Sequence, residues 1–180
     1  MECWEPTGIR VTDTSRRAAH GGPTRGSRSV VFVCWGNICR SPMAERVAEK
    51  LAADRGIDDV RFSSAATSRE ELGAPIDSRA VSVLKRHGYR TGGHSAHQIT
   101  RSEIEAAELV LAMEDIHVRK MLAIAPGATN IRLLTDFDPD AAPGSGIDDP
   151  WYGPGSGFER TLASVEGAIP GLLDQLERHA

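Results

Sequence analysis

Apolar runs alternate with amphipathic segments over most of the chain. The stretch SVVFVC at 29–34 is β-branched and has no polar face, which is typical of a strand in the middle of a parallel sheet. Apolar residues at helical spacing follow in 43–56, and the alternation then continues along the chain. We expect further strands at 60–65, 108–113 and 130–134, and further helices at 77–88, from 100, at 115–127 and at 158–176.

This alternation predicts right-handed βαβ units. The expected fold class is therefore α/β: a four-stranded parallel sheet with helices on both faces, in a single domain without internal repeats. Ligands of such sheets bind beyond the carboxyl ends of the strands. Functional residues are therefore expected directly after the strand at 29–34.

Several residues predict where the helices begin or bend. Asp77 is expected as an N-cap, and Thr100 with Glu103 forms the sequence of a capping box. Asp115 is expected to cap the helix at 115–127. Pro170 stands inside the last helix and should kink it, because proline lacks the N–H that the helix needs.

The first 28 residues differ from the rest in composition. Gly, Pro, Ser, Thr and Arg dominate them, and no apolar period is visible. Such a segment buries too little apolar surface to offset the entropy of folding. We expect residues 1–28 to form a disordered extension and residues 29–180 to form the folded domain.

Charge and composition exclude several classes of partner. The net charge is −4 and the sequence pI is about 5.9, so no basic field is available for nucleic acid. No apolar run approaches the roughly 18 residues of a membrane span, and no secretory signal is recognisable. The cytoplasm is therefore the expected location, with export that needs no signal left open. Three cysteines are too few for a disulfide framework.

Cys34 ends the first predicted strand, and a helix is expected to begin at Pro42. Unpaired N–H groups at a helix start favour an anion, and such surroundings lower thiol pKa values from about 8.5 to between 3.5 and 7.5. The same N–H groups suit a tetrahedral oxyanion, and Arg40 can add a bidentate contact to two of its oxygens. Cys34 is therefore a candidate nucleophile toward a phosphate group.

The residues between Cys34 and Pro42 fit a phosphate-binding loop. Gly36 and Asn37 tolerate the positive φ angles that such a loop needs. The Ser41 hydroxyl can reach the sulfur of Cys34 and stabilise it as attacking and leaving group. The alternative is a buried structural cysteine, which the polar neighbours Arg40 and Asn37 make unfavourable.

Asp149 is a candidate general acid, since thiolate attack on a phosphate monoester leaves an alkoxide or phenoxide that needs a proton. It lies in GIDDPWYGPG, a surface loop rich in glycine and proline, where catalytic groups are common. A solvated acidic turn is the alternative, and Asp148 is the neighbour that competes for the role. Trp151 and Tyr152 follow at once and can stack against a phenyl ring, with core packing of one of them as the alternative.

The segment CWGNICRSPMAE resembles the phosphate-binding loop of the low-molecular-weight protein tyrosine phosphatases. The resemblance continues through SSAATS, GAPIDSRA, KRHG, HSAHQIT, LAMEDIHVRKM and DDPWYGPGSGFE, over nearly everything from about Val30 to Arg178. It implies that residues 29–180 form a low-molecular-weight phosphatase domain with its phosphate loop at the carboxyl end of the first strand.

The resemblance also implies roles for single residues. Cys34 would be the nucleophile, Arg40 the phosphate clamp and Asp149 the general acid. The phosphate loop would comprise Trp35, Gly36, Asn37, Ile38, Cys39 and Ser41. His94 would support the loop by bonding to Asn37. Trp35, Trp151 and Tyr152 would form the wall around the substrate.

Other titratable residues receive no role. His87, His117 and His179 fall in helical segments without metal-ligand spacing. His97 stands where the family often carries Arg, and Glu114 where it usually carries Asp. No cluster suggests a metal, and phosphoryl transfer through cysteine requires neither metal nor cofactor.

The predicted function is hydrolysis of phosphotyrosine in a protein substrate through a cysteinyl phosphate. An arsenate reductase would carry further cysteines downstream, and none follows Cys39. A protein-arginine phosphatase of this fold usually carries Thr at the place of Ile38. A non-catalytic phosphotyrosine-binding module would not need Cys34, Arg40 and Asp149 together.

Cys39 has two readings. A second thiol beside a reactive thiolate can trap its sulfenic acid as a disulfide, which makes Cys39 a candidate resolving thiol. It can equally be a small buried residue that supports the loop.

Overall fold

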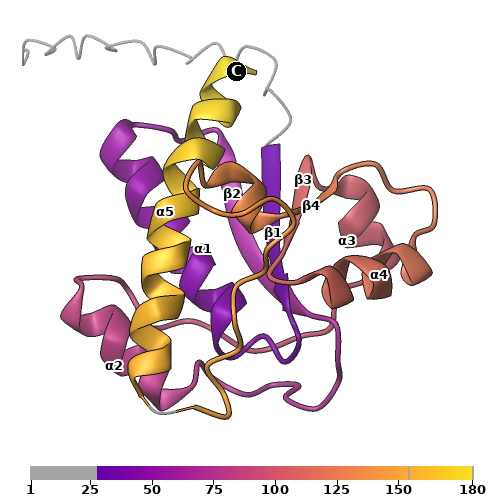
Figure 1. Cartoon of the computed structure of the whole chain (residues 1–180). Helices are drawn as coiled ribbons and strands as arrows, with labels where there is room; N and C mark the ends of the chain where they lie inside the picture. Colours follow the sequence, from indigo (N-terminus) through magenta and orange to yellow (C-terminus); the bar gives the residue numbers. More distant parts are fainter. Residues whose placement is uncertain (1–27, 154, 180) are drawn as a thin grey trace, which may run out of the picture.

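A computed structural model of the chain describes residues 28–153 and 155–179. Its four strands form one parallel sheet in the order β2-β1-β3-β4 (Figure 1). The strands are β1 (Arg28–Cys34), β2 (Val60–Ala66), β3 (Leu109–Ala112) and β4 (Ile131–Leu133). The α/β class and the four-stranded parallel sheet are thus confirmed.

Helices cover both faces of the sheet. They are α1 (Arg40–Arg55), α2 (Ser78–Arg86), α3 (Arg101–Ala106), α4 (Asp115–Ile124), α5 (Ser156–Arg178) and the short 3₁₀ helix η1 (Leu134–Phe137). Figure 1 shows α1, α2 and α5 on one side of the sheet and α3 and α4 on the other. None of the described helices is long and apolar enough to cross a membrane.

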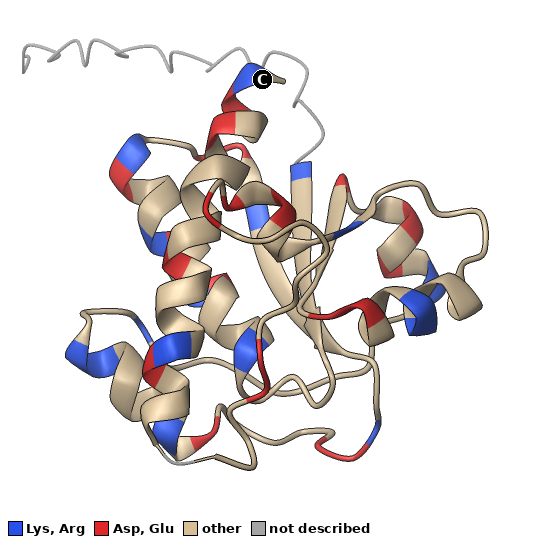
Figure 2. Ribbon diagram, viewed as in Figure 1, with Lys and Arg blue, Asp and Glu red and all other residues tan. Residues whose placement is uncertain are grey.

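The apolar run of β1 explains this layering, because side chains of a strand point alternately to its two faces. Val30 and Phe32 belong to the core under α1 and α5, while Val31 and Val33 belong to the core under α3 and α4. Acidic and basic residues are interspersed along the helices on the outside (Figure 2).

Several predicted helix ends are confirmed. Asp77 is the N-cap of α2 and accepts a hydrogen bond from the backbone N–H of Arg79 at 2.8 Å. The capping box of α3 is present, with the hydroxyl of Thr100 accepting from the N–H of Glu103.

Other boundaries differ from the prediction. The N-cap of α4 is Glu114, so the expected cap Asp115 is its first helical residue. The reason is that Glu114 has extended backbone angles and Asp115 already takes helical ones. Similarly, α1 begins at Arg40 before Pro42, and α5 runs on both sides of Pro170, where the kink stays a prediction.

The predicted division of the chain at 28/29 falls next to a structured residue. β1 begins at Arg28, whose backbone N–H donates to the carbonyl of Asp59 at 3.2 Å. The remainder of the predicted extension, 1–27, lies outside the described residues. Its disorder therefore stays a prediction.

Candidate active site

The site begins where β1 ends. Cys34 is the last residue of β1 and Arg40 the first of α1, so the loop between them lies at the carboxyl end of a central strand. Asn37 has a φ of 58°, the left-handed conformation expected for it. Gly36 does not have a positive φ, so the prediction for it is wrong. A Cβ at Gly36 would lie 3.1 Å from the Cγ of Glu71, and the glycine thus leaves room for that side chain.

A buried hydrogen-bond network supports this loop. The Sγ of Cys34 and the Oγ of Ser41 lie 3.1 Å apart. The Nδ2 of Asn37 donates to Ser41 at 3.0 Å and to the hydroxyl of Ser64 at 2.9 Å. Ser64 donates in turn to Glu45 at 2.5 Å. Asn37 and Ser41 are fully buried, so protein groups rather than water hold their polar atoms in place.

His94 bonds to the loop from outside the network. Its Nε2 lies 2.7 Å from the carbonyl oxygen of Asn37. Burial lowers the pKa of His94, which favours the neutral ring with its proton on Nε2 as the donor. His97 contributes its backbone N–H to the Oδ1 of Asn37 at 3.2 Å, and its ring pairs with Glu103 at 2.9 Å.

Arg40 joins the loop to two distant segments. Its guanidinium is 2% exposed and pairs through Nη1 with Glu114, the N-cap of α4. The same Nη1 donates to the carbonyl of Ile147 at 2.9 Å. Nη2 donates to the Oδ2 of Asp149 at 2.6 Å. Arg40 is therefore held in place at the point where a bound oxyanion would need it.

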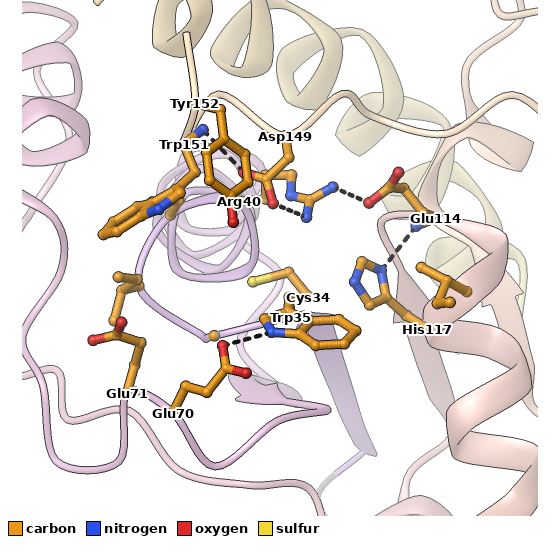
Figure 3. Close-up of a pocket in the computed structure, with 14 residues that line it drawn as sticks. Cys34, Trp35, Arg40, Glu70, Glu71, Glu114, His117, Asp149, Trp151 and Tyr152 are labelled. Atoms are coloured by element: carbon orange, nitrogen blue, oxygen red, sulfur yellow. Dashed lines mark hydrogen bonds and ion pairs between the residues drawn. The ribbon is translucent and has the colours of Figure 1, made fainter.

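Asp149 faces the same pocket as Cys34 (Figure 3). Its Oδ1 accepts a hydrogen bond from the backbone N–H of Trp151 at 3.0 Å, which turns the carboxyl group toward Arg40. Asp148 is exposed and does not line the pocket. The geometry therefore favours Asp149 over its neighbour as a proton donor to a bound group.

These residues enclose one pocket of about 210 Å³. Its walls include the predicted residues Cys34, Trp35, Gly36, Ile38, Cys39, Arg40, Asp149, Trp151 and Tyr152. The Nε1 of Trp35 donates to Glu70 at 2.9 Å, and the ammonium group of Lys120 lies 4.5 Å from the ring centroid. Tyr152 is 93% exposed. The pocket thus has a polar floor and an aromatic mouth.

His117 also lines the pocket, although no role is predicted for it from the sequence. Its ring is fully buried, and its Nδ1 accepts the backbone N–H of Glu114 at 3.1 Å, which caps α4. Burial and the nearby charge of Arg40 lower its pKa to about 4. The only signal in the sequence is its place on the third residue of a helix, where a side chain can reach back to the N-cap.

Glu114, Glu70 and Glu71 line the pocket as well, and sequence reasoning gave none of them a place there. Glu114 stands where the family usually carries Asp. Its longer side chain still reaches Arg40. Glu70 and Glu71 lie in the segment after β2, which carries no local sign of a pocket.

Cys39 is buried beside the pocket floor and is the N-cap residue of α1. Both Cys34 and Cys39 are free thiols. Burial raises the pKa of Cys39, and the negative charge of Asp77 adds to this effect. A resolving thiol reacts as thiolate, so a raised pKa slows that reaction. The resolving role stays a prediction.

No metal-binding cluster is visible in 28–153 and 155–179: no three residues of His, Cys, Asp or Glu converge there.

A parallel α/β sheet with a cysteine, a buried arginine and an acid at its carboxyl edge defines a phosphate-binding class of site. Comparison with known proteins agrees, because the model of the family described as low molecular weight phosphotyrosine protein phosphatase matches residues 29–180. The chain belongs to this family.

The relatives support this assignment. Low molecular weight protein-tyrosine phosphatase A of Mycobacterium tuberculosis is 41% identical over 150 residues, which cover 82% of this chain and 91% of that protein. A crystal structure of a protein tyrosine phosphatase from Entamoeba histolytica is 29% identical, with a TM-score of 0.80 over 85% of this chain and 99% of that one. Wzb of Vibrio vulnificus, solved with benzylphosphonate, is 27% identical with a TM-score of 0.73, over 83% of this chain and 99% of its own.

Proposed function

We propose that the protein hydrolyses phosphotyrosine in protein substrates, in two steps and through a cysteinyl phosphate. The observation that carries this proposal is the convergence of Cys34, Arg40 and Asp149 on one pocket. A nucleophile, an anion clamp and a proton donor are the groups that hydrolysis of a phosphate monoester requires.

In the first step the Sγ of Cys34 attacks phosphorus in line with the departing phenol oxygen. A P–S bond forms as the P–O bond breaks, and Asp149 gives its proton to the phenol oxygen. Arg40 and the loop N–H groups hold the equatorial oxygens, whose charge grows in the transition state.

In the second step Asp149 removes a proton from water, and the resulting hydroxide attacks phosphorus. The P–S bond breaks, inorganic phosphate leaves and Cys34 returns as thiolate. The hydroxyl of Ser41, 3.1 Å from the sulfur, can donate a hydrogen bond to that leaving thiolate. Neither step uses a metal or another cofactor.

The pocket mouth favours a phosphorylated aromatic side chain. Trp35, Trp151 and Tyr152 offer flat apolar surface on which a phenyl ring can stack. Ile38 lines the same pocket and adds an apolar side chain to it, which favours a phenyl ring over the charged guanidinium of phosphoarginine. The net charge of −4 gives the chain no overall positive charge to attract nucleic acid as substrate or partner.

We also propose that the protein works in the cytoplasm. Cys34 must stay reduced to act as a nucleophile, and both Cys34 and Cys39 are free thiols. Reducing compartments maintain such thiols. Fractionation of cells with an antibody to the chain would test the location, and recovery outside the cell would point to export without a signal.

The function is tested with a phosphotyrosine peptide, a phosphoarginine peptide and arsenate on the purified protein. Cys34→Ser should lose hydrolysis and still bind inorganic phosphate, because the anion site survives without its nucleophile. Asp149→Asn should lower kcat/KM by roughly 10²–10⁴, and most for poor leaving groups. Asp148→Asn is the matched control and should behave as the wild type.

Each other outcome contradicts a part of the proposal. Turnover in Cys34→Ser above about a tenth of wild type would remove Cys34 as the nucleophile. Faster hydrolysis of phosphoarginine than of phosphotyrosine would change the substrate class. Reduction of arsenate would make the protein a reductase, and tight binding of the peptide without turnover would make it a binding module.

A further inference from the structure

Arg79, the second residue of α2, lies between two functional segments. Its guanidinium bonds to the carboxylate of Asp77 through Nε at 3.0 Å and Nη2 at 3.2 Å. Its remaining nitrogen, Nη1, donates to the backbone carbonyl of Trp151 at 3.2 Å. The guanidinium carbon also lies 5.2 Å from the ring centroid of Trp151 and 4.7 Å from that of Phe158.

Trp151 connects Arg79 to Asp149, the proposed general acid, through two hydrogen bonds. The N–H of Trp151 donates to the Oδ1 of Asp149 at 3.0 Å, while the carbonyl of the same residue accepts from Arg79. Arg79 thus holds Trp151 by its main chain and by its ring. A shift of Trp151 would move the hydrogen bond that orients the carboxyl group of Asp149.

The contact with Asp77 leads to the phosphate loop. The N–H of Asp77 donates to the carbonyl of Ile38 at 2.8 Å. Burial raises the pKa of the Asp77 carboxyl, but its hydrogen bonds from Arg79 outweigh this effect and the pKa lies below its ordinary value. Asp77 therefore bonds to the loop through its backbone N–H and to Arg79 through its charged carboxylate.

We propose that Arg79 is a positioning residue, which sets the distance between the Asp149 carboxyl and the phosphate loop. Four bonded steps connect them: Ile38 to Asp77, Asp77 to Arg79, Arg79 to Trp151 and Trp151 to Asp149. The inference rests on the proposed role of Asp149 as general acid. It adds a residue that touches neither the substrate nor the reacting atoms.

The shape of the guanidinium matters more here than its charge. The side chain of Arg79 is 38% exposed, so its ion pair with Asp77 contributes little through charge alone. A planar guanidinium can form the two bonds to Asp77, donate to a carbonyl and stack on two rings at once. A lysine ammonium can keep only part of this set. Arg79→Lys should therefore share most of the defect of Arg79→Ala.

The test measures kcat/KM on aryl phosphates whose phenol leaving groups span a range of pKa. A displaced acid slows the poor leaving groups, which need the proton, and spares the good ones. Arg79→Ala should lose about 10- to 100-fold on poor leaving groups, the range that small misplacements produce. Inhibition by inorganic phosphate should be unchanged, because Arg40 and the loop are intact.

Two comparisons separate positioning from general damage. In Asp149→Asn, adding Arg79→Ala should cause no further loss on poor leaving groups. Arg86→Ala removes an arginine of the same helix that pairs with Glu159 on α5, and it should leave the leaving-group dependence as in the wild type. If Arg79→Ala does not fold, Arg79→Lys is measured instead, and it should also lose kcat/KM on poor leaving groups and keep it on good ones.

Equal loss on good and poor leaving groups, or a further loss in the Asp149→Asn background, would overturn the inference. A wrong assignment of Asp149 as the acid can be distinguished from a wrong role for Arg79. If Asp149→Asn itself lacks a leaving-group dependence, the assignment of the acid fails. If Asp149→Asn shows it and both Arg79 variants match the wild type, only the role of Arg79 fails.

Discussion

His117 combines a helix cap and a pocket wall in one side chain. Its Nδ1 accepts the N–H of Glu114, so the neutral ring carries its proton on Nε2. Protonation of Nδ1 would break that cap and place a cation beside Arg40. Burial of the ring and then the nearby charge of Arg40 lower the pKa of His117 to about 4.

This lowered pKa predicts a dependence of stability on pH. Below about pH 6.5 the unfolded chain binds a proton at this histidine, while the folded protein does not until about pH 4. The free energy of unfolding should therefore fall as the pH drops through this window, by up to about 3 kcal/mol from this residue. In His117→Asn the amide oxygen can still accept from Glu114 but does not titrate.

Urea unfolding between about pH 7 and pH 4.5 checks this. His117→Asn should show a smaller loss of unfolding free energy than the wild type over this range. His87→Asn, which removes an exposed histidine after α2, is the control. Identical pH dependence in His117→Asn and wild type would mean that His117 is not held neutral by the fold.

At the scale of single residues, the sequence predicts those parts of the site that lie close together along the chain. Cys34 and Arg40 stand at the two ends of one loop, so their spacing alone indicates an anion site. Glu114 reaches Arg40 and Arg79 reaches Trp151 from segments that are distant in sequence. Such contacts depend on how helices pack, which no local pattern records.

At the scale of elements, hydrophobic periodicity predicts the strands and helices because each must bury one face or both. The end of a helix depends on backbone angles of one or two residues, which explains the error at Asp115. The contact between α5 and η1 is likewise invisible in the sequence. It depends on glycines of α5, since Gly171 lies against the backbone of Phe137 and Gly167 against the side chain of Asp138.

These two glycines predict results of different size for the same substitution. A Cβ at Gly171 would collide with the carbonyl oxygen of Phe137, which belongs to the backbone and cannot easily move. Gly171→Ala should destabilise the protein by roughly 1–3 kcal/mol, although alanine alone favours a helix by about 1 kcal/mol. At Gly167 the nearest atom is the Oδ2 of Asp138 at 2.9 Å, which can rotate away.

Chemical denaturation of both variants measures the difference. Gly167→Ala should lie within about 1 kcal/mol of wild type, in either direction. Equal stability of the two alanine variants would show that η1 can shift away from α5 at little cost.

At the scale of the whole molecule, parallel topology explains why the site is where it is. The loop after β1 and the N-terminal ends of α1, α2 and α4 all meet beyond the carboxyl ends of the strands, and the loop 147–152 closes that edge (Figure 1). The fold class predicted from alternating elements therefore also predicted the location of the site. The particular neighbours of each catalytic group needed the structure.

The contacts of Arg28, at the amino end of β1, predict where the folded domain begins. Arg28, at the start of β1, donates to Glu108 through Nε at 2.7 Å and Nη2 at 2.9 Å, and Nη2 also donates to the carbonyl of Leu176 at 3.0 Å. It thereby joins β1 to the segment before β3 and to the end of α5. The chain from Arg28 onward should fold and act without residues 1–27.

A protein that comprises residues 28–180 should keep kcat/KM within about 2-fold of the full chain, because the site lies at the other edge of the sheet. Adding Arg28→Ala to it should lower the free energy of unfolding by about 1–3 kcal/mol, the usual effect of losing hydrogen bonds to a charged group. Activity should remain, since none of these bonds reaches the pocket. A large loss of activity in 28–180 itself would show that residues 1–27 contribute to the site and would place the domain boundary earlier in the chain.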